Sequence, residues 1–320
     1  SLVNGFKHTA LTYLAIRSGI VDALEQEPRS LTDIAAVTNM PEEGLERALR
    51  ALVAIRICNL VDQQFSLTDI GKLLIRDNEL PLRSGLLVDV EQRWLSWQQL
   101  PLAVSTGQPV FKQIHGLSPW ELREANPQLS NDFNHWLALE TRRVAQQIVP
   151  QLPLQGTETI ADIGGGHGGL LRAALDAFPH CSGVLFDLPA VVAQSLNAIP
   201  TQRIQTIGGN FLDSITVEAD ILMLKSVLHD WADADCKCIL ANCRATMKVG
   251  QRLLIIERFI DDDANPLEQA ILDMQMLLLH GGRERTRAAY EALLKASGLT
   301  PVSCKRTPSG FFILECVPSP

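Results

Sequence analysis

Residues 159–169 read Thr-Ile-Ala-Asp-Ile-Gly-Gly-Gly-His-Gly-Gly, and this stretch decides the fold class. Its first five residues are mainly apolar, which predicts a buried strand. The glycines that follow predict a tight turn, and residues 170–178 have the apolar spacing of a helix. A strand, a glycine turn and a helix in this order open an α/β unit, in which glycine lets the backbone approach a ligand closely.

Strands and helices continue to alternate through the second half of the chain, which predicts a parallel sheet with helices on both faces. We therefore expect an α/β fold with a Rossmann-like, doubly wound sheet. The last two strands flank a turn at 307–309 and should add an antiparallel edge. The predicted strands are 159–163, 184–187, 204–207, 221–224, 252–257, 300–305 and 310–317, and the predicted helices are 170–178, 190–198, 233–247 and 287–296.

The predicted secondary structure changes near residues 150–157, where two prolines and a glycine interrupt the helical pattern. Everything before this point is mainly helical, and a small hairpin follows the first helices. This order is typical of a winged helix. Residues 81–124 have no pattern that places their tryptophans. The predicted elements are helices at 8–24, 31–37 and 41–55, strands at 59–61 and 65–67, and a long helix that begins at Asn126-Pro127.

Composition excludes several classes of protein. The chain has 320 residues, enough for two domains, and 46% of them are hydrophobic. A net charge of −8 argues against a nucleic-acid partner, because phosphate binding needs a positive surface. The apolar stretches are too short to cross a membrane. Residues 1–5 lack the features of a signal peptide, so we expect a cytoplasmic protein.

The chain has seven cysteines, an odd number. Cys236, Cys238 and Cys243 lie in a predicted helix at spacings that do not present a tetrahedral set of ligands. We therefore expect thiols rather than a metal site. No cluster of acidic residues suggests a divalent metal either, so no metal is expected.

The glycine turn fits the dinucleotide-binding pattern at Gly164, Gly166 and Gly169, but a purely structural turn would fit as well. Asp162 separates the alternatives, because a carboxylate at the end of this strand would oppose a pyrophosphate and favour a cationic ligand. S-adenosylmethionine carries a sulfonium and an ammonium group, so its amino-acid end suits this position. Asp187 ends the next strand, where it can accept hydrogen bonds from two ribose hydroxyls.

A candidate general base follows the strand at 221–224. His229 lies in Lys-Ser-Val-Leu-His-Asp-Trp (225–231), at the sheet edge where ligands bind. A histidine takes up a proton near neutral pH, although an isolated histidine here could simply bond to nearby backbone. Glu257 ends a later strand, where packing does not explain a carboxylate. Glu284 lies in 281–286, where a surface ion pair with a neighbouring arginine is the alternative.

These motifs together resemble the plant-type and hydroxyindole-type family of S-adenosylmethionine-dependent O-methyltransferases, over nearly the whole chain. Several spaced matches in order are more specific than any one of them. The matching segments are Asp-Ile-Gly-Gly-Gly-His-Gly (162–168), Phe-Asp-Leu-Pro (186–189), Gly-Gly-Asn-Phe (208–211), Leu-Lys-Ser-Val-Leu-His-Asp-Trp (224–231), Ile-Glu-Arg (256–258) and Gly-Gly-Arg-Glu-Arg-Thr (281–286).

The resemblance implies a role for each of these positions. His229 would be the general base, with Glu257 and Glu284 orienting its ring and stabilising the imidazolium. Position 210 is Asn where the family commonly has Asp, and we expect altered rather than lost contact with adenosine. The cofactor-binding residues would be Asp162, Gly164, Gly166, Asp187, Leu188, Gly209, Asn210, Phe211, Lys225 and Ser226, and the acceptor-binding residues would be Phe133, Trp136, Leu137 and Asp230.

The resemblance also implies a domain organisation and partners. Residues 1–80 would form a winged-helix-like dimerisation region, residues 81–152 a helical linker with the acceptor pocket, and residues 153–320 the catalytic domain. We expect a homodimer and a small aromatic acceptor that carries a hydroxyl.

Three other functions remain open from the sequence alone. The same scaffold could catalyse decarboxylation, hydroxylation or a pericyclic rearrangement, for which a full His-Glu-Glu set would be unnecessary. A winged-helix DNA-binding regulator is disfavoured by the acidic helix at 41–55. An NAD-dependent oxidoreductase would explain the glycines but neither Asp162 nor the segment around His229.

Overall fold

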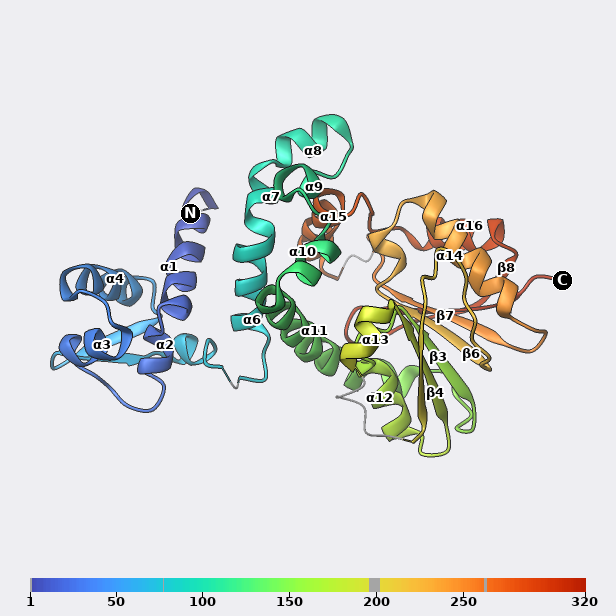
Figure 1. Cartoon of the computed structure of the whole chain (residues 1–320), viewed down its shortest axis with the longest axis horizontal. Helices are drawn as coiled ribbons and strands as arrows, with labels where there is room; N and C mark the ends of the chain where they lie inside the picture. The colour runs from blue at the N-terminus through green and yellow to red at the C-terminus, as the bar shows by residue number, and fades with distance from the viewer. Residues whose placement is uncertain (1, 77, 196–201, 262–263) are drawn as a thin grey trace. The chain divides into compact units, whose positions relative to one another are not determined.

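The computed structural model describes residues 2–76, 78–195, 202–261 and 264–320. The chain divides into two compact units, which Figure 1 draws along one colour ramp. The first unit comprises Ser1–Trp94 and Asn126–Glu140, and the second comprises Leu95–Ala125 and Thr141–Pro320. Each unit has its own hydrophobic core, so each is described by itself.

The first unit contains the predicted helices and hairpin around a core that includes Ile20, Leu49 and Phe65. One expectation is wrong: the helix predicted over residues 8–24 is broken at Gly19, which has φ of 81°. This left-handed conformation ends α1 and redirects the chain. The elements are α1 (Gly5–Arg17), α2 (Ile20–Ala23), α3 (Leu31–Thr38), α4 (Glu42–Ala54), β1 (Cys58–Val61), β2 (Gln64–Leu67), α5 (Asp69–Lys72), α6 (Leu82–Val88) and a π-helix over Asp89–Arg93.

Local sequence explains why these helices begin where they do. Ser30 accepts a hydrogen bond from the N–H of Asp33, whose carboxylate bonds back to the Ser30 N–H, so α3 begins with a capping box. Asp62 and Gln63 both have positive φ, and they close the tight turn between β1 and β2. The order of helices and hairpin is as predicted, whereas the winged-helix assignment stays a prediction.

Within residues 81–124, which had no recognisable pattern, α6 and the π-helix are followed by a series of short helices. They are α7 (Trp94–Gln98), α8 (Leu100–Thr106), α9 (Phe111–His115) and α10 (Pro119–Ala125), followed by α11 (Pro127–Ile148) and a 3-10 turn over Val149–Gln151. Helices of five to seven residues are too short to show a periodic pattern. Phe111 and Ala103 from this region pack against Leu278 and Leu279.

The described part of the second unit contains a seven-stranded sheet in the order β5-β4-β3-β6-β7-β9-β8. The first five strands are parallel, and β9 joins β7 in the antiparallel sense, as predicted. Figure 1 shows the central strands side by side. The strands are β3 (Thr159–Ile163), β4 (Ser182–Asp187), β5 (Ile204–Gly208), β6 (Ile221–Lys225), β7 (Arg252–Glu257), β8 (Leu299–Arg306) and β9 (Phe312–Pro318).

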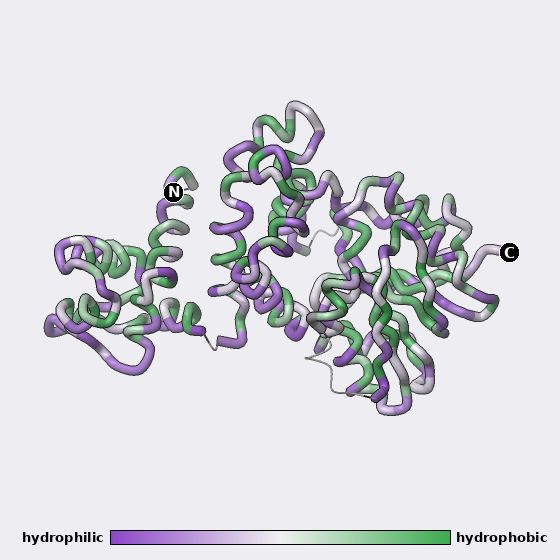
Figure 2. Tube along the Cα trace, viewed as in Figure 1, coloured by the Kyte–Doolittle hydropathy of each residue, from purple (hydrophilic) through white to green (hydrophobic). Residues whose placement is uncertain are grey.

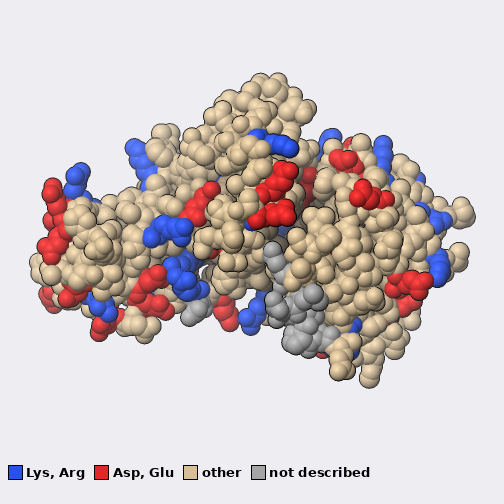
Figure 3. Space-filling model, viewed as in Figure 1, with Lys and Arg blue, Asp and Glu red and all other residues tan. Residues whose placement is uncertain are grey.

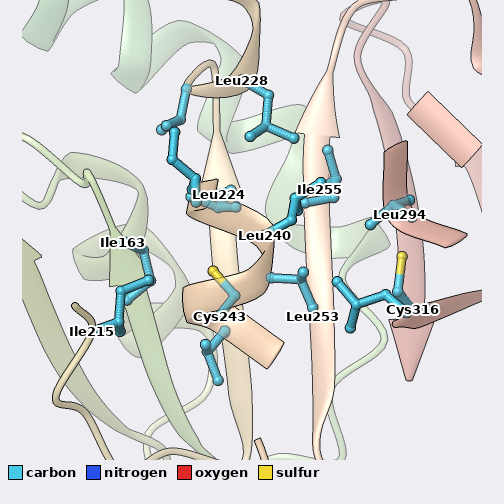
Figure 4. Packing of buried hydrophobic residues seen from close by; sticks show 14 of the residues in the cluster. Ile163, Ile215, Leu224, Leu228, Leu240, Cys243, Leu253, Ile255, Leu294 and Cys316 are labelled. Carbon is cyan, nitrogen blue, oxygen red and sulfur yellow. The ribbon is translucent and has the colours of Figure 1, made fainter. Parts of the chain in front are cut away.

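Helices cover both faces of this sheet. Side chains alternate between faces along a strand: Leu222 and Leu224 join the core under α14 and α16, whereas Ile221 and Met223 join the core under α12. Figure 4 shows Leu240 and Cys243 of the α14 core beside Leu224, and Figure 2 shows the hydrophobic colour along the central strands. The helices are α12 (Gly169–Ala177), α13 (Pro189–Ser195), α14 (Asp233–Thr246), α15 (Pro266–Leu279) and α16 (Arg287–Ala296).

The predicted helix over 190–198 runs beyond the described residues after Ser195. None of the helices in the described ranges combines the length and the apolar character that crossing a membrane requires. On the face seen in Figure 3, basic and acidic side chains are interspersed.

Candidate active site

The parallel strands bring the candidate residues to one edge of the sheet. β3, β4, β6 and β7 all run in the same direction, so their carboxyl ends lie together. At these ends stand Ile163 before the glycine turn, Asp187, Lys225 and Glu257. The topology therefore assembles residues that are almost 100 positions apart in the sequence.

The glycine turn is shaped by backbone contacts that larger residues would prevent. The N–H of Gly164 donates to Phe186 O at 2.7 Å, and Gly164 and Gly166 have φ of 69° and 59°. A Cβ on Gly165 would lie 2.6 Å from the Asp162 carboxylate. The turn thus depends on glycine at successive positions.

Asp162 is 2% exposed beneath this turn. Burial and, to a smaller extent, the charge of Asp187 raise the pKa of its carboxyl group to about 7, whereas the charge of Lys225 lowers it. A cation placed near Asp162 would stabilise the charged form of this carboxylate. The buried acid therefore favours a positively charged ligand at the glycine turn.

Asp187 bonds to the same turn through one carboxylate oxygen and to the backbone of its own neighbour through the other. Oδ2 accepts from the N–H of Gly166 and Oδ1 accepts from the N–H of Leu188, each at 2.7 Å. Burial raises the pKa of Asp187, whereas these two bonds lower it. Each carboxylate oxygen can accept a further hydrogen bond, so Asp187 can still bind ligand hydroxyls. Leu188 beside it is 44% exposed.

The segment after β5 closes against β4. The N–H of Gly209 donates to Asp187 O at 2.9 Å, and a Cβ on Gly209 would lie 2.6 Å from the Phe186 ring. Asn210 Oδ1 accepts from the N–H of Leu212 at 3.0 Å, so this side chain also shapes its own turn. Phe211 packs edge-on against Trp231, with ring centroids 5.7 Å apart.

Two further candidates lie where β6 ends. Lys225 Nζ lies 5.1 Å from the centre of the Phe311 ring. Ser226 has φ of 53°, unusual for a residue other than glycine, and its N–H donates to Ile256 O at 3.1 Å. This conformation turns the chain out of the strand immediately before the segment that carries His229.

His229 lies in a 3-10 turn over Leu228–Asp230, and its ring is fixed by Glu284. Nδ1 lies 2.7 Å from Glu284 Oε1, whereas Nε2 lies 3.7 Å from Asp230 Oδ1, which is too long for a hydrogen bond. The N–H of Glu284 donates to Asp273 Oδ1 at 2.9 Å. If Nδ1 carries the proton shared with Glu284, Nε2 has a lone pair and can act as a base.

Glu257 acts on the backbone of the same turn rather than on the ring. Its Oε1 accepts hydrogen bonds from the N–H groups of Val227 at 3.0 Å and Leu228 at 2.9 Å. Its Oε2 is buried without a hydrogen-bond partner among the described residues. Burial and the charge of Glu284 raise the pKa of Glu257 to about 7, whereas His229 and the two N–H groups lower it.

These carboxylates decide the charge of His229. Burial alone would lower its pKa, but Glu257, Asp230 and Glu284 together raise it to about 10. The ligand-free protein therefore favours an imidazolium at neutral pH. A cation bound nearby would favour loss of this proton, because like charges repel.

Three residues that the sequence analysis did not assign to the site hold the turn in place. The Arg285 guanidinium, in a residue that is 3% exposed, donates to Leu228 O at 2.9 Å and Trp231 O at 2.7 Å, and pairs with Asp233 at 2.7 Å. The N–H of Arg283 donates to His229 O at 2.9 Å. A Cβ on Gly282 would lie 2.1 Å from the same oxygen. In the sequence, the one indication that Gly282, Arg283 and Arg285 contribute to the site was their place in the motif at 281–286.

A second histidine was also missed. His280 Nε2 lies 3.8 Å from Asp230 Oδ1, and the His280 ring stacks on Trp120 at a centroid distance of 5.3 Å. Nothing in the local sequence distinguishes this histidine, which follows the last residue of α15.

Phe133, Trp136 and Leu137 lie on α11 in the first unit, whereas His229 lies in the second. Phe133 and Trp136 have ring centroids 5.5 Å apart, and the Arg93 guanidinium lies 4.9 Å from the Trp136 ring. That these residues bind the acceptor stays a prediction.

All seven cysteines lie in the described residues and are free thiols. Cys238 is exposed, and its thiol donates to Leu212 O at 3.1 Å. Burial raises the pKa of Cys236 and of Cys243 to about 12. The described residues contain no group of three or more His, Cys, Asp or Glu side chains that could hold a metal ion.

Comparisons with known proteins identify the family. The O-methyltransferase domain family matches residues 97–300, and the O-methyltransferase dimerisation domain family matches residues 1–77. A mitomycin biosynthesis 6-O-methyltransferase of Streptomyces lavendulae is 32% identical over 90% of this chain and 84% of its own length. The phenazine O-methyltransferase PhzM of Lysobacter antibioticus is 30% identical over 99% of this chain and 94% of its own.

Solved structures agree with this assignment. The crystal structure of the O-methyltransferase NcsB1 from neocarzinostatin biosynthesis, in complex with S-adenosyl-L-homocysteine and 1,4-dihydroxy-2-naphthoic acid, has a TM-score of 0.86 to this chain at 27% identity. The match covers 97% of this chain and 96% of that one. These findings decide against the DNA-binding regulator and the NAD-dependent oxidoreductase. The chain belongs to the O-methyltransferase family, and it is an enzyme of that class.

Proposed function

We propose that this enzyme transfers the methyl group of S-adenosylmethionine to a hydroxyl of a small aromatic acceptor. The observation that carries the proposal is the His229–Glu284 pair at 2.7 Å, on the sheet edge that also bears the glycine turn. Glu284 holds Nδ1, which leaves Nε2 for the proton of a substrate.

The residues at the glycine turn fit the proposed cofactor. The turn approaches Asp162 so closely that a Cβ on Gly165 would collide with its carboxylate, and this buried acid favours a cation. Asp162, Gly164 and Gly166 would hold the amino-acid end, and Asp187 with Leu188 the ribose. Gly209, Asn210, Phe211, Lys225 and Ser226 would surround the adenosine. Bound S-adenosylmethionine supplies a methyl group on a positively charged sulfur, which is a good leaving group.

The protein's own contribution is to position the acceptor and remove its proton. His229 Nε2 takes the hydroxyl proton as the oxygen forms its bond to the methyl carbon. Glu284 then stabilises the imidazolium through Nδ1, and Glu257 holds the turn through its two N–H bonds. Base catalysis of this kind contributes about 10²- to 10⁴-fold to the rate.

The proposed acceptor class rests on relatives and on the aromatic side chains of α11. The relatives act in mitomycin and phenazine pathways, and NcsB1 binds a dihydroxynaphthoic acid. Flat aromatic acceptors suit pockets lined by aromatic side chains. We propose, as the family resemblance implies, that Phe133, Trp136 and Leu137 bind the acceptor, and that Asp230 also contacts it.

The match of residues 1–77 to a dimerisation domain supports a homodimer. We propose the division into a winged-helix-like dimerisation region at 1–80, an acceptor-pocket region at 81–152 and a catalytic domain at 153–320. A cytoplasmic location stays a prediction.

The test is direct. The purified protein is incubated with S-adenosylmethionine and a panel of hydroxylated aromatics, and products are followed by mass spectrometry. A product heavier by one methylene, with equimolar S-adenosylhomocysteine, is expected. Tight cofactor binding without transfer across the panel would favour a different reaction on the same scaffold. Failure to bind the cofactor would contradict the proposal.

A further inference from the structure

Side chains of α14 hold the backbone of the segment that is proposed to surround the adenosine. The Asn242 amide nitrogen donates to Phe211 O at 2.8 Å and to Leu212 O at 3.2 Å. One turn earlier on the same face of the helix, the Cys238 thiol also donates to Leu212 O, at 3.1 Å. Two successive carbonyl groups that follow β5 are therefore bound by side chains of α14.

The chemistry of asparagine suits this position. Its amide NH₂ group has two donors, so one side chain can bond to both carbonyl groups. On the opposite side of the segment, Asn210 Oδ1 accepts from the N–H of Leu212 at 3.0 Å. The backbone at Phe211 and Leu212 is thus held through its N–H side by Asn210 and through its C=O side by Asn242.

The Phe211 ring, which projects from this backbone, contacts both turns of the candidate site. A Cβ on Gly164 would lie 3.3 Å from the ring, so the ring packs against the glycine turn. The ring also meets Trp231 edge-on, with centroids 5.7 Å apart and an interplanar angle of 88°. Trp231 follows His229 by two residues, and its carbonyl oxygen accepts from Arg285 at 2.7 Å. The ring therefore connects the glycine turn with the segment that carries the proposed base.

The glycine turn also touches that segment directly. The same Cβ on Gly164 would lie 3.0 Å from Val227 Cγ2, and the N–H of Val227 donates to Glu257 Oε1 at 3.0 Å. Because protein interiors are closely packed, a shift of the Phe211 ring must be absorbed by its neighbours. A displaced ring would therefore disturb both the turn proposed to hold the cofactor and the turn that carries the base.

On the basis of the proposed function, we infer that Asn242 is a positioning residue for methyl transfer, which acts through Phe211. Its two hydrogen bonds fix the backbone from which the Phe211 ring projects. The ring in turn fixes the glycine turn and the turn of His229 relative to each other. Asn242 thereby couples the affinity for the cofactor to the placement of the base, so loss of its two bonds should weaken both.

Two substitutions remove the donors of Asn242. Asn242→Asp keeps the shape of the side chain but places a carboxylate against two carbonyl oxygens, and Asn242→Leu removes every polar atom. Each variant should raise the Kd for S-adenosylmethionine, measured by calorimetry, about 10-fold. Each should also lower kcat about 10-fold at saturating cofactor with the best acceptor found, because a base that is slightly misplaced takes the proton less efficiently.

Thr246→Val is the matched control on the same helix. Thr246 Oγ1 donates to Val217 O at 2.8 Å, so the substitution removes a similar bond from α14 to a different loop. Its Kd and kcat should equal those of the wild type. The Tm of every variant is measured as well, and a fall in Tm for Thr246→Val without a change in kcat would separate positioning from a general loss of stability.

A double-mutant cycle with Phe211→Leu tests whether Asn242 acts through the ring. Phe211→Leu alone should impair both the Kd and kcat. Adding Asn242→Leu should then change either quantity by less than about 2-fold, because the ring that Asn242 positions is already gone. Effects of the two substitutions that multiply would show that they act independently, and would overturn the inference.

The outcomes distinguish this inference from the function on which it rests. Wild-type Kd and kcat in both Asn242 variants would overturn the inference and leave the proposed function intact. So would a raised Kd with an unchanged kcat at saturating cofactor, since Asn242 would then serve adenosine binding alone. If the wild type yields no S-adenosylhomocysteine above the acceptor-free blank with any acceptor, the proposed function and the inference both fail.

Discussion

The glycine turn at 164–169 and the histidine turn at 226–233 lie at the same sheet edge but are stabilised in opposite ways. The glycine turn depends on backbone shape, with positive φ at Gly164, Gly166 and Gly168. The histidine turn depends on charged side chains from other segments, namely Glu257, Glu284 and Arg285.

The two turns therefore differ in how the sequence determines their structure. The conformation of a turn built from glycines is determined by consecutive residues, so it can be predicted from the local sequence. A turn built from buried charges is encoded by residues far along the chain, and each charge raises or lowers the pKa of the others. Damage to the first should therefore affect ligand affinity, and damage to the second should affect proton transfer.

The largest expected effect is on the histidine turn. His229→Ala should lower kcat by about 10²- to 10⁴-fold, because no other group would take the proton from the acceptor. The Kd for S-adenosylmethionine, measured by calorimetry, should change little. A large loss of cofactor affinity would instead indicate a structural histidine. His115→Ala controls for removal of an imidazole elsewhere in this unit.

Two glycine substitutions should distinguish the role of the glycine turn in cofactor binding from the role of the histidine turn in proton transfer. Gly165→Ala places a Cβ 2.6 Å from the Asp162 carboxylate and should weaken cofactor binding by about 10- to 100-fold. Gly282→Ala places one 2.1 Å from His229 O and should lower kcat by a similar factor with near-normal cofactor affinity. Gly44→Ala is the control, since nothing lies within 4 Å of its Cβ. If Gly165→Ala and Gly282→Ala weakened cofactor binding equally, the two turns would not have the separate roles that we expect.

Glu284→Gln tests the charge that acts on His229. The protonated ring cannot act as a base, so wild-type kcat/KM should rise with pH toward the His229 pKa, which is about 10 in the ligand-free protein and lower when the cationic cofactor is bound. The Glu284 carboxylate raises that pKa, so its loss should move the rise to lower pH. At high pH, kcat should be about 10-fold lower, because the ring is less well oriented.

The measurement for Glu284→Gln is a pH–rate profile with saturating cofactor and the best acceptor found. Glu291→Gln removes a carboxylate that pairs with Arg287 on α16 and should leave the profile unchanged. A profile for Glu284→Gln that coincides with the wild type would show that Glu284 does not act on the base.

The smallest effect is expected at Asn210. Its Oδ1 accepts from the N–H of Leu212, and an Asp carboxylate can accept the same bond. Asn210→Asp should therefore change the Kd for S-adenosylmethionine by less than about 3-fold. Abolished binding would show that the Asn amide makes an essential contact.

The fold of the second unit could be predicted because its signals are local. β3 and β7 have the predicted bounds, since each is a short apolar run that ends at a turn or a polar residue. The break at Gly19 was missed because the apolar spacing continues through it, although the backbone there is left-handed. The helices within residues 94–125 were not predicted for a different reason, because they are too short for a periodic pattern to appear.

The site was predictable as a set of residues but not as a set of contacts. The local alternative for Glu284 was an ion pair with Arg283 or Arg285, whereas the structure pairs Arg285 with Asp233 and Glu284 with His229, 55 positions away. His280 gave no signal because its contacts, Asp230 and Trp120, come from two other segments. Long-range pairing of side chains needs the fold.

The thiol of Cys238 offers a way to observe the enzyme at work. It is exposed on α14 and bonds to Leu212 O, directly after the segment proposed to surround the adenosine. Cys236 and Cys243 on the same helix are buried, and their raised pKa keeps them in the unreactive thiol form. A fluorescent maleimide should therefore attach first at Cys238, where its emission would report arrival and departure of the cofactor in real time.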